Sequence, residues 1–276
     1  MWSGANFRVS QRGGSHERPT GARVPGPGWR ALAVVALAVL GLGLAACGGP
    51  DAGVGRAPTR AAATATARPS VVYVALGASD AVGVGADNPN TQGYVPRLIA
   101  RLPASAQALN LGVSGITLHD ALTEEVPPAL AAHPTLMTVW LAANDFKDCV
   151  PLAQYGADLN TLLALLQAHT QARVFVADLP DLSELPVFQN GAAQAGPCTQ
   201  GETAAQIRAQ VLQWNQVIDA AVARHGDFLV DLFNSQLAAH PEYIYRDGFH
   251  PSSAGYAVLA DLFSTQIQAH GGAPRA

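Results

Sequence analysis

Five short apolar runs, separated by longer amphipathic stretches, constrain the fold of this chain more than any other feature. Strands buried in a parallel sheet have this nearly continuous apolar character, because helices cover both faces of the sheet. The runs are therefore predicted to be parallel strands. They lie at residues 71–76, 108–111, 136–142, 173–178 and 228–232.

Helical periodicity fills the stretches between and after these runs. Apolar residues recur at spacings of three and four over 159–166, 207–222 and 256–267, as they do on the buried face of a helix. Ser252, which follows Pro251, is a suitable N-cap for the last helix. Alternating strands and helices predict a single α/β domain with right-handed crossovers and helices on both faces of the sheet.

The residues before the first strand predict export. Five Arg residues precede residue 31, and an uncharged run of Ala, Val, Leu and Gly then extends from Ala31 to Ala46. Sixteen residues are short for a bilayer span, which takes about 20, so a signal peptide is the better interpretation. The run closes on Leu44-Ala45-Ala46-Cys47, which resembles the lipobox of bacterial lipoproteins, in which the cysteine is acylated.

This resemblance implies that residues 1–46 are a lipoprotein signal peptide and that lipidated Cys47 starts the mature chain. The alternatives are a plain signal peptide with an incidental cysteine, or a short anchor helix. We expect an extracytoplasmic protein, anchored to the cell membrane through Cys47. Residues 47–70 contain Gly, Pro, Ala and Thr without periodicity and are predicted to be a tether, which leaves 71–276 for the folded domain.

The bulk charge excludes one class of partner. The formal net charge is −4 and only 13% of the residues are charged, so no basic surface for nucleic acid is expected. We expect a monomer.

The remaining cysteines, Cys149 and Cys198, are expected to form a disulfide, because both fall in predicted loops of an exported protein. Two buried free thiols are the alternative. Neither a C-x-x-C motif nor a histidine spacing suggests a metal site.

Candidate catalytic residues follow the predicted strands. Ser79 lies on a Gly-containing turn after the first run, glycines follow the second, Asn144 follows the third, and Asp247 and His250 come after the fifth. Ligands of parallel sheets bind at the carboxyl ends of the strands. These residue types supply a nucleophile, a base, a group that orients the base, and oxyanion donors, which together are the parts that acyl transfer requires.

The spacing of Asp247 and His250 has a specific chemical use. A separation of three residues in a turn lets the carboxylate accept a hydrogen bond from the His250 Nδ1–H. Nε2 is then free to take the proton of the Ser79 hydroxyl.

In four blocks the chain resembles the SGNH hydrolases, also called GDSL esterases and lipases. The resemblance covers roughly residues 71–267 and implies a three-layer α/β/α, flavodoxin-like fold with a five-stranded parallel sheet. It makes Ser79, Asp247 and His250 the catalytic triad. Gly115 and Asn144 join the Ser79 N–H in the oxyanion hole, with Gly112 as the second choice of glycine. The blocks read ALGASDAVGVGA, NLGVSGIT, LAANDF and DGFHP.

Three positions depart from the family pattern. Ala78 stands where the family usually has Asp before the serine, Ile116 where Asp often follows the second-block glycine, and Ala142 where Gly often opens the third block. None of these is a predicted triad or oxyanion residue, but the changes bear on how rigidly the loops are held and on the rate.

The resemblance implies a serine esterase or acylhydrolase that needs no cofactor and acts on a small-molecule, lipid or carbohydrate ester. Acyl transfer to a sugar uses the same residues and differs in excluding water. A binding lipoprotein that kept the fold but lost activity is the alternative of another class. Ala78 favours that alternative, whereas the intact Ser79, Asn144, Asp247 and His250 favour the enzyme.

Overall fold

The central element of the fold is a five-stranded sheet. The computed structural model describes residues 71–189 and 196–271, so the predicted signal peptide and tether lie outside the described residues. All strand pairs are parallel, and the strand order is β2-β1-β3-β4-β5. This is the flavodoxin-like order. The strands are β1 (Val72–Gly77), β2 (Gln107–Asn110), β3 (Leu136–Trp140), β4 (Arg173–Ala177) and β5 (Phe228–Val230).

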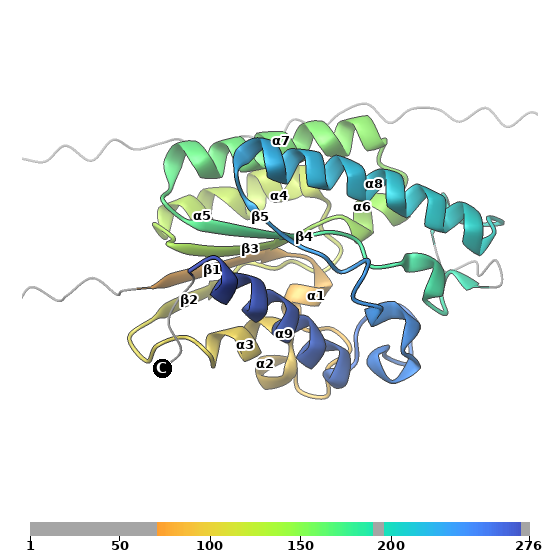
Figure 1. Ribbon diagram of the computed structural model, residues 1–276, viewed down its shortest axis with the longest axis horizontal. Helices are drawn as coiled ribbons and strands as arrows, with labels where there is room; N and C mark the ends of the chain where they lie inside the picture. Colours follow the sequence, from red (N-terminus) through yellow and green to blue (C-terminus); the bar gives the residue numbers. More distant parts are fainter. Residues whose placement is uncertain (1–70, 190–195, 272–276) are drawn as a thin grey trace, which may run out of the picture. The chain divides into compact units, whose positions relative to one another are not determined.

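Helices cover both faces of this sheet, as the alternation predicts (Figure 1). One face carries α4 (Leu118–Glu124), α5 (Val126–Ala131), α7 (Leu152–His169) and α8 (Ala204–His225). The other carries α3 (Tyr94–Ile99) and α9 (Ser253–Ala269), with α2 (Pro89–Gln92) beside them. The short α1 (Ser79–Val82) and α6 (Ala143–Lys147) follow β1 and β3 directly.

The three central strands fit the sequence prediction, whereas β2 differs from it. Almost every residue of β1, β3 and β4 is buried, while all four residues of β2 are exposed. An edge strand pairs on one side only and is covered less completely by helices. The strand is short and ends in Asn110, whose side chain donates to the carbonyl of Ala81.

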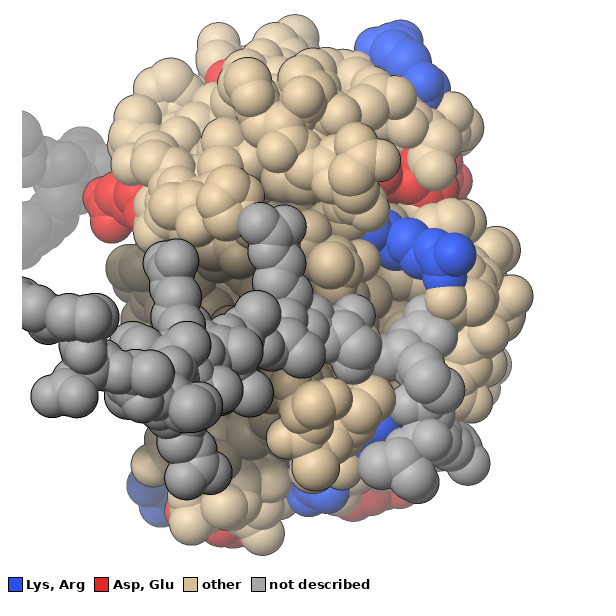
Figure 2. All heavy atoms as spheres, turned by 90° about the vertical axis from the view of Figure 1, so that its left-hand side faces the viewer, with Lys and Arg blue, Asp and Glu red and all other residues tan. Residues whose placement is uncertain are grey.

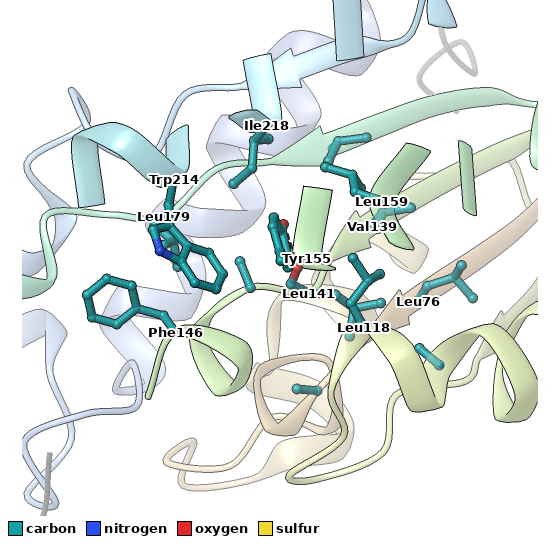
Figure 3. Close-up of a cluster of buried hydrophobic side chains, with 14 of the residues drawn as sticks. Leu76, Leu118, Val139, Leu141, Phe146, Tyr155, Leu159, Leu179, Trp214 and Ile218 are labelled. Atoms are coloured by element: carbon teal, nitrogen blue, oxygen red, sulfur yellow. Dashed lines mark hydrogen bonds between the residues drawn. The ribbon is translucent and has the colours of Figure 1, made fainter. Parts of the chain in front are cut away.

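Two apolar clusters, one on each face, hold the layers together. The larger cluster packs β1, β3 and β4 against α4, α7 and α8 (Figure 3). Its aromatic centre is Trp214, whose ring lies 4.6 Å from that of Tyr155 and 5.5 Å from that of Phe146. The smaller cluster packs the other face against α3 and α9, where the rings of Tyr94 and Phe263 stack at 5.2 Å.

Local signals set the ends of the long helices. Thr203 and Gln206 form a reciprocal capping box at the start of α8, and Gly226 ends that helix with φ of 72°. Ser252 caps α9 by accepting from the Gly255 N–H, which confirms the predicted cap.

The amino-terminal end of the sheet carries only scattered charged side chains among its described residues (Figure 2).

No helix in the described ranges is long and apolar enough to cross a membrane.

Candidate active site

Ser79 is the first residue of α1 and lies where the strand order reverses. The chain passes from β1 to β2 on one side of β1, and then from β2 through α4 and α5 to β3 on the other side. Such a switch point opens a crevice at the carboxyl ends of the strands. Ser79 is therefore placed where the fold binds ligands.

The structure brings Ser79, His250 and Asp247 into one hydrogen-bonded chain. The Ser79 Oγ lies 2.8 Å from His250 Nε2, and His250 Nδ1 lies 2.7 Å from Asp247 Oδ2. The first contact joins residues 171 positions apart, whereas the second joins residues three positions apart. Because Nδ1–H donates to the carboxylate, Nε2 is left as the acceptor for the serine hydroxyl.

The other carboxylate oxygen of Asp247 orders the turn itself. Asp247 Oδ1 accepts from the N–H of Phe249 at 2.9 Å and of His250 at 3.0 Å. Burial would raise the pKa of Asp247, but the hydrogen bonds from His250 and from these two amides outweigh burial and lower it. Asp247 therefore stays ionised near neutral pH and can stabilise a protonated His250.

Close packing against Gly85 holds the His250 loop from behind. A side chain at Gly85, whose φ is +96°, would place its Cβ 2.5 Å from the carbonyl oxygen of Pro251 and 3.2 Å from the Cβ of His250. Only glycine permits this approach at this φ. Gly85 thus helps to fix His250 against the segment between α1 and α2.

The predicted oxyanion donors line the same open cleft as Ser79 and His250. Asn144 is buried, and its Nδ2 donates one hydrogen to the carbonyl of Ile116 at 2.8 Å. An amide nitrogen carries two hydrogens, so the second remains for a ligand. Gly115 has φ of 83° and is exposed to the cleft, whereas the Gly112 N–H donates to Asn110 Oδ1. Gly115 is therefore the better placed of the two glycines.

Asp145, next to Asn144, also links α6 to the segment that follows Gly115. Both of its carboxylate oxygens accept from the Leu118 N–H, at 3.2 and 3.0 Å, and its side chain is buried. Burial raises the pKa of Asp145 to about 6, although the hydrogen bond from Leu118 opposes the shift. Asp145 and Asn144 thus fasten α6 to the loop that carries Gly115.

The cleft has a volume of about 600 Å³ and apolar as well as charged walls. Val187, Phe188 and Phe249 supply the apolar part, and Lys147 lines the cleft as an ion pair with Asp148. Phe146, which lies next to Lys147 on α6, does not line the cleft but lies in the core against Trp214 (Figure 3). Helical geometry explains the difference, because consecutive residues of α6 point in different directions.

The predicted disulfide between Cys149 and Cys198 is present in the structure, with its Cα atoms 5.4 Å apart. It links the segment after α6 to the segment before α8. The sequence next to Cys149 borders the cleft through Lys147 and Asp148. The disulfide therefore restrains one wall of the candidate site.

Two further buried acids, Asp80 and Glu125, lie near the site. Asp80 is buried beside Ser79 and faces a small, mostly apolar cavity of about 30 Å³, and burial raises its pKa to about 6. Glu125 is buried under the loops of Gly77 and Val113. A carboxyl in the middle of a helical pattern is ordinarily exposed, so only the packing reveals it.

Among the described residues, no group of His, Cys, Asp or Glu is arranged to hold a metal ion.

The chain belongs to the GDSL-like Lipase/Acylhydrolase family, whose model matches residues 75–258. The match includes the Ser79, Asn144 and His250 segments, and the fold is that of the SGNH hydrolases. No curated protein matches the chain significantly.

Solved structures show the same fold at low sequence identity. TesA is 22% identical with a TM-score of 0.56, over 72% of this chain and 98% of TesA. An acetylxylan esterase from Geobacillus stearothermophilus is 18% identical with a TM-score of 0.55, over 72% and 94% of the two chains. An extracellular lipase from Streptomyces rimosus is 18% identical with a TM-score of 0.55, over 71% and 100%.

Proposed function

We propose that this protein is a serine carboxylic-ester hydrolase that works through an acyl-enzyme on Ser79. The observation that carries the proposal is the continuous chain from Ser79 Oγ to His250 Nε2 and from His250 Nδ1 to Asp247, with contacts of 2.8 and 2.7 Å. Such a chain makes a weakly acidic hydroxyl nucleophilic, because a base lies within reach of its proton.

In acylation, Ser79 Oγ bonds to the carbonyl carbon of the ester while His250 Nε2 takes the hydroxyl proton. The carbonyl π electrons move to oxygen, which becomes the oxyanion of a tetrahedral intermediate. As the carbon–oxygen single bond of the ester breaks, His250 gives the proton to the departing alkoxide. The alcohol leaves, and the acyl group stays on Ser79.

Three donors are available for the oxyanion: the backbone N–H groups of Ser79 and Gly115 and the second hydrogen of Asn144 Nδ2. The first hydrogen of Asn144 is held by the carbonyl of Ile116, which fixes the direction of the second. Donors oriented in advance stabilise the developing charge without reorganising during the reaction.

Hydrolysis fits the cleft better than acyl transfer to a sugar. The His250 side chain is 17% exposed and the cleft is wide, so water reaches the base and can attack the acyl-enzyme. Transfer needs a site that keeps water out. The apolar wall of Val187 and Phe188 suits a short acyl or alcohol group, and the similar acetylxylan esterase and lipase are consistent with an ester substrate.

The test is chemical labelling and turnover of Ser79→Ala beside the wild type. A phosphonate probe should label the wild-type protein on Ser79, and the wild type should hydrolyse a 4-nitrophenyl ester. The variant should do neither, since Ser79 is the hydroxyl residue that the structure places in hydrogen-bond contact with His250 Nε2. Full esterase activity in Ser79→Ala would refute the site.

A non-catalytic binding protein is the second candidate, and Ala78 is the feature that favours it. It predicts that the wild type binds esters without turnover. The same chromogenic ester separates the two candidates, because a catalyst releases 4-nitrophenol in excess over protein and a binder releases none.

We further propose that Cys47, which lies outside the described residues, carries lipid and anchors the domain outside the cytoplasm. The support is the basic leader, the apolar run and the Leu44-Ala45-Ala46-Cys47 sequence. Cys47→Ser should release the protein from membranes or leave it unprocessed. Mass spectrometry that maps the mature N-terminus well away from Cys47 would refute the anchor.

A further inference from the structure

Glu125 is a buried acid that none of the catalytic steps uses. It lies at the junction of α4 and α5, and its exposed fraction is 1%. Pro127 and Pro128 follow it, and because proline has no N–H, the hydrogen bonds that would continue α4 are lost. α4 therefore ends at Glu124 and α5 begins at Val126, and the buried Glu125 side chain reaches the end of β1 instead of solvent.

The carboxyl of Glu125 joins the two loops that hold the backbone oxyanion donors. Its Oε2 accepts from the Gly77 N–H at 3.0 Å, and the Val113 N–H lies close enough to oppose the rise of its pKa. Gly77 is two residues before Ser79, and Val113 is two residues before Gly115. The Val113 N–H also donates to the carbonyl of Gly77 at 3.1 Å, so the three groups form one compact cluster.

No strand hydrogen bond replaces this contact. The pairing of β1 with β2 ends at Ala75 and Asn110, so the ladder does not extend to Gly77 on that side. Gly77 is buried in β1, and a buried N–H without an acceptor is costly. Glu125 supplies the acceptor that the short strand β2 does not.

We propose that Glu125 is a positioning residue of the oxyanion hole, which sets the Ser79 N–H and the Gly115 N–H at a fixed separation. This inference rests on the proposed function. The turn after β1 carries Ala78 where the family usually has a carboxyl beside the serine. The Glu125 carboxyl, from the α4–α5 junction, holds this turn instead.

The ionisation of Glu125 determines which variant should preserve its role. Burial raises the pKa of Glu125 to about 8, although hydrogen bonds from Gly77 and Val113 oppose the shift. The side chain is therefore mostly neutral at pH 7. A neutral carboxyl accepts through its carbonyl oxygen, and a glutamine amide presents the same oxygen at the same length.

The test compares Glu125→Gln, which keeps the acceptor, with Glu125→Met, which keeps most of the length but removes the acceptor. Glu125→Asp, which retracts the carboxyl by one methylene, is a second variant in case Glu125→Met does not fold. The matched control is Glu124→Gln, because the neighbouring Glu124 is exposed. Thermal melting first identifies which variants are folded at the assay temperature.

We expect Glu125→Met and Glu125→Asp to lower kcat for a 4-nitrophenyl ester by about 10- to 100-fold, as small misplacements of catalytic groups do. KM should change by less than about threefold, because the hole acts mainly in the transition state. The rate of phosphonate labelling of Ser79 should fall in parallel. Glu125→Gln and Glu124→Gln should stay within about threefold of the wild type.

A folded Glu125→Met or Glu125→Asp with the kcat and labelling rate of Glu125→Gln would overturn the inference while leaving the proposed function intact. The inference would also be overturned if Glu125→Met and Glu125→Asp lowered the melting temperature but left kcat and the labelling rate unchanged. The role of Glu125 would then be purely structural. If wild-type protein is neither labelled on Ser79 nor active on esters, the proposed function fails and the inference fails with it.

Discussion

The candidate site has two halves that are built in opposite ways. The proton-transfer half takes Asp247 and His250 from one turn of four residues, so most of its geometry is local. The oxyanion half gathers Ser79, Gly115 and Asn144 from the ends of three different strands. Local geometry survives small shifts between elements, whereas the second half needs contacts that hold separate segments in register.

The acids that support the two halves differ in the same way. Asp247 is partly exposed, and its hydrogen bonds lower its pKa. Asp145 and Glu125 are buried, and burial raises the pKa of each, to about 6 and about 8. The first half therefore uses a charge to stabilise a protonated base, while the second uses buried acids, whose charged form burial disfavours, as hydrogen-bond acceptors for backbone N–H groups.

The largest effect is expected in the proton-transfer half. His250→Ala should lower kcat by about 10⁴- to 10⁶-fold, because the residues of a triad act as a unit. Steady-state turnover of a 4-nitrophenyl ester measures this loss, with His119→Ala as the control because His119 is exposed. A loss below about 10-fold would mean that His250 is not the base.

A smaller loss is expected when one oxyanion donor is removed. Asn144→Ala should lower kcat by about 10²- to 10³-fold with little change in KM, since the donor acts on charge that develops only in the transition state. The matched control is Asn160→Ala on α7, which lies outside the cleft. If KM rises in place of a fall in kcat, Asn144 binds the ground state and the assignment is wrong.

Removing an acid that only holds the oxyanion donors in place should lower kcat less than removing a donor. Asp145→Ala leaves the buried Leu118 N–H without its acceptor, which costs about 1–3 kcal/mol of stability. We expect a decrease in kcat of about 10-fold in the folded variant, because Asn144 keeps its own bond to Ile116. Chemical denaturation and ester turnover measure the two effects, and the control is Asp219→Ala on α8, because Asp219 is exposed and lies outside the cleft. If the denaturation midpoint and kcat of Asp145→Ala equal those of the wild type, Asp145 does not hold α6 and the Leu118 segment together.

The smallest effect concerns how stability varies with pH. Asp178, at the end of β4, accepts from the Leu232 and Phe233 N–H groups, and burial raises its pKa from 3.8 to about 7. A raised acid pKa in the folded state means that its stabilising contribution is complete below pH 3.8 and is lost as the pH rises to about 7.

Asp178→Asn should therefore flatten the fall of melting temperature between about pH 4 and pH 7. Melting curves of wild type, Asp178→Asn and the exposed control Glu124→Gln across this range measure the difference. A slope identical to that of the wild type would contradict the neutral, buried state that separates such acids from Asp247.

Much of the fold follows from patterns that are local in the sequence. The apolar runs predict all five strands, and the helical spacing predicts α7, α8 and α9. The exception is β2, whose exposure depends on its place at the edge of the sheet. Strand order is a property of the whole sheet, so no run of four residues encodes it.

The candidate site divides in the same way. The spacing of Asp247 and His250 predicts their hydrogen bond, because three residues in a turn allow few other arrangements. The place of Phe146 in the core could not be predicted, since the direction of a side chain on the short helix α6 depends on what packs against it. The preference for Gly115 over Gly112 likewise depends on the bond between Gly112 and Asn110.

The sequence by itself determined an α/β domain with a nucleophile, a base and its acid at the ends of predicted strands. Its N-terminal pattern also predicts export and lipidation at Cys47, which stay predictions. Only the tertiary structure decided which buried acids hold these ends together. Glu125 is 48 residues from Gly77, and Asp145 is 27 residues from Leu118. The physical reason is that the pKa of an acid rises in this way only when distant segments exclude water around it, and no local pattern specifies that burial.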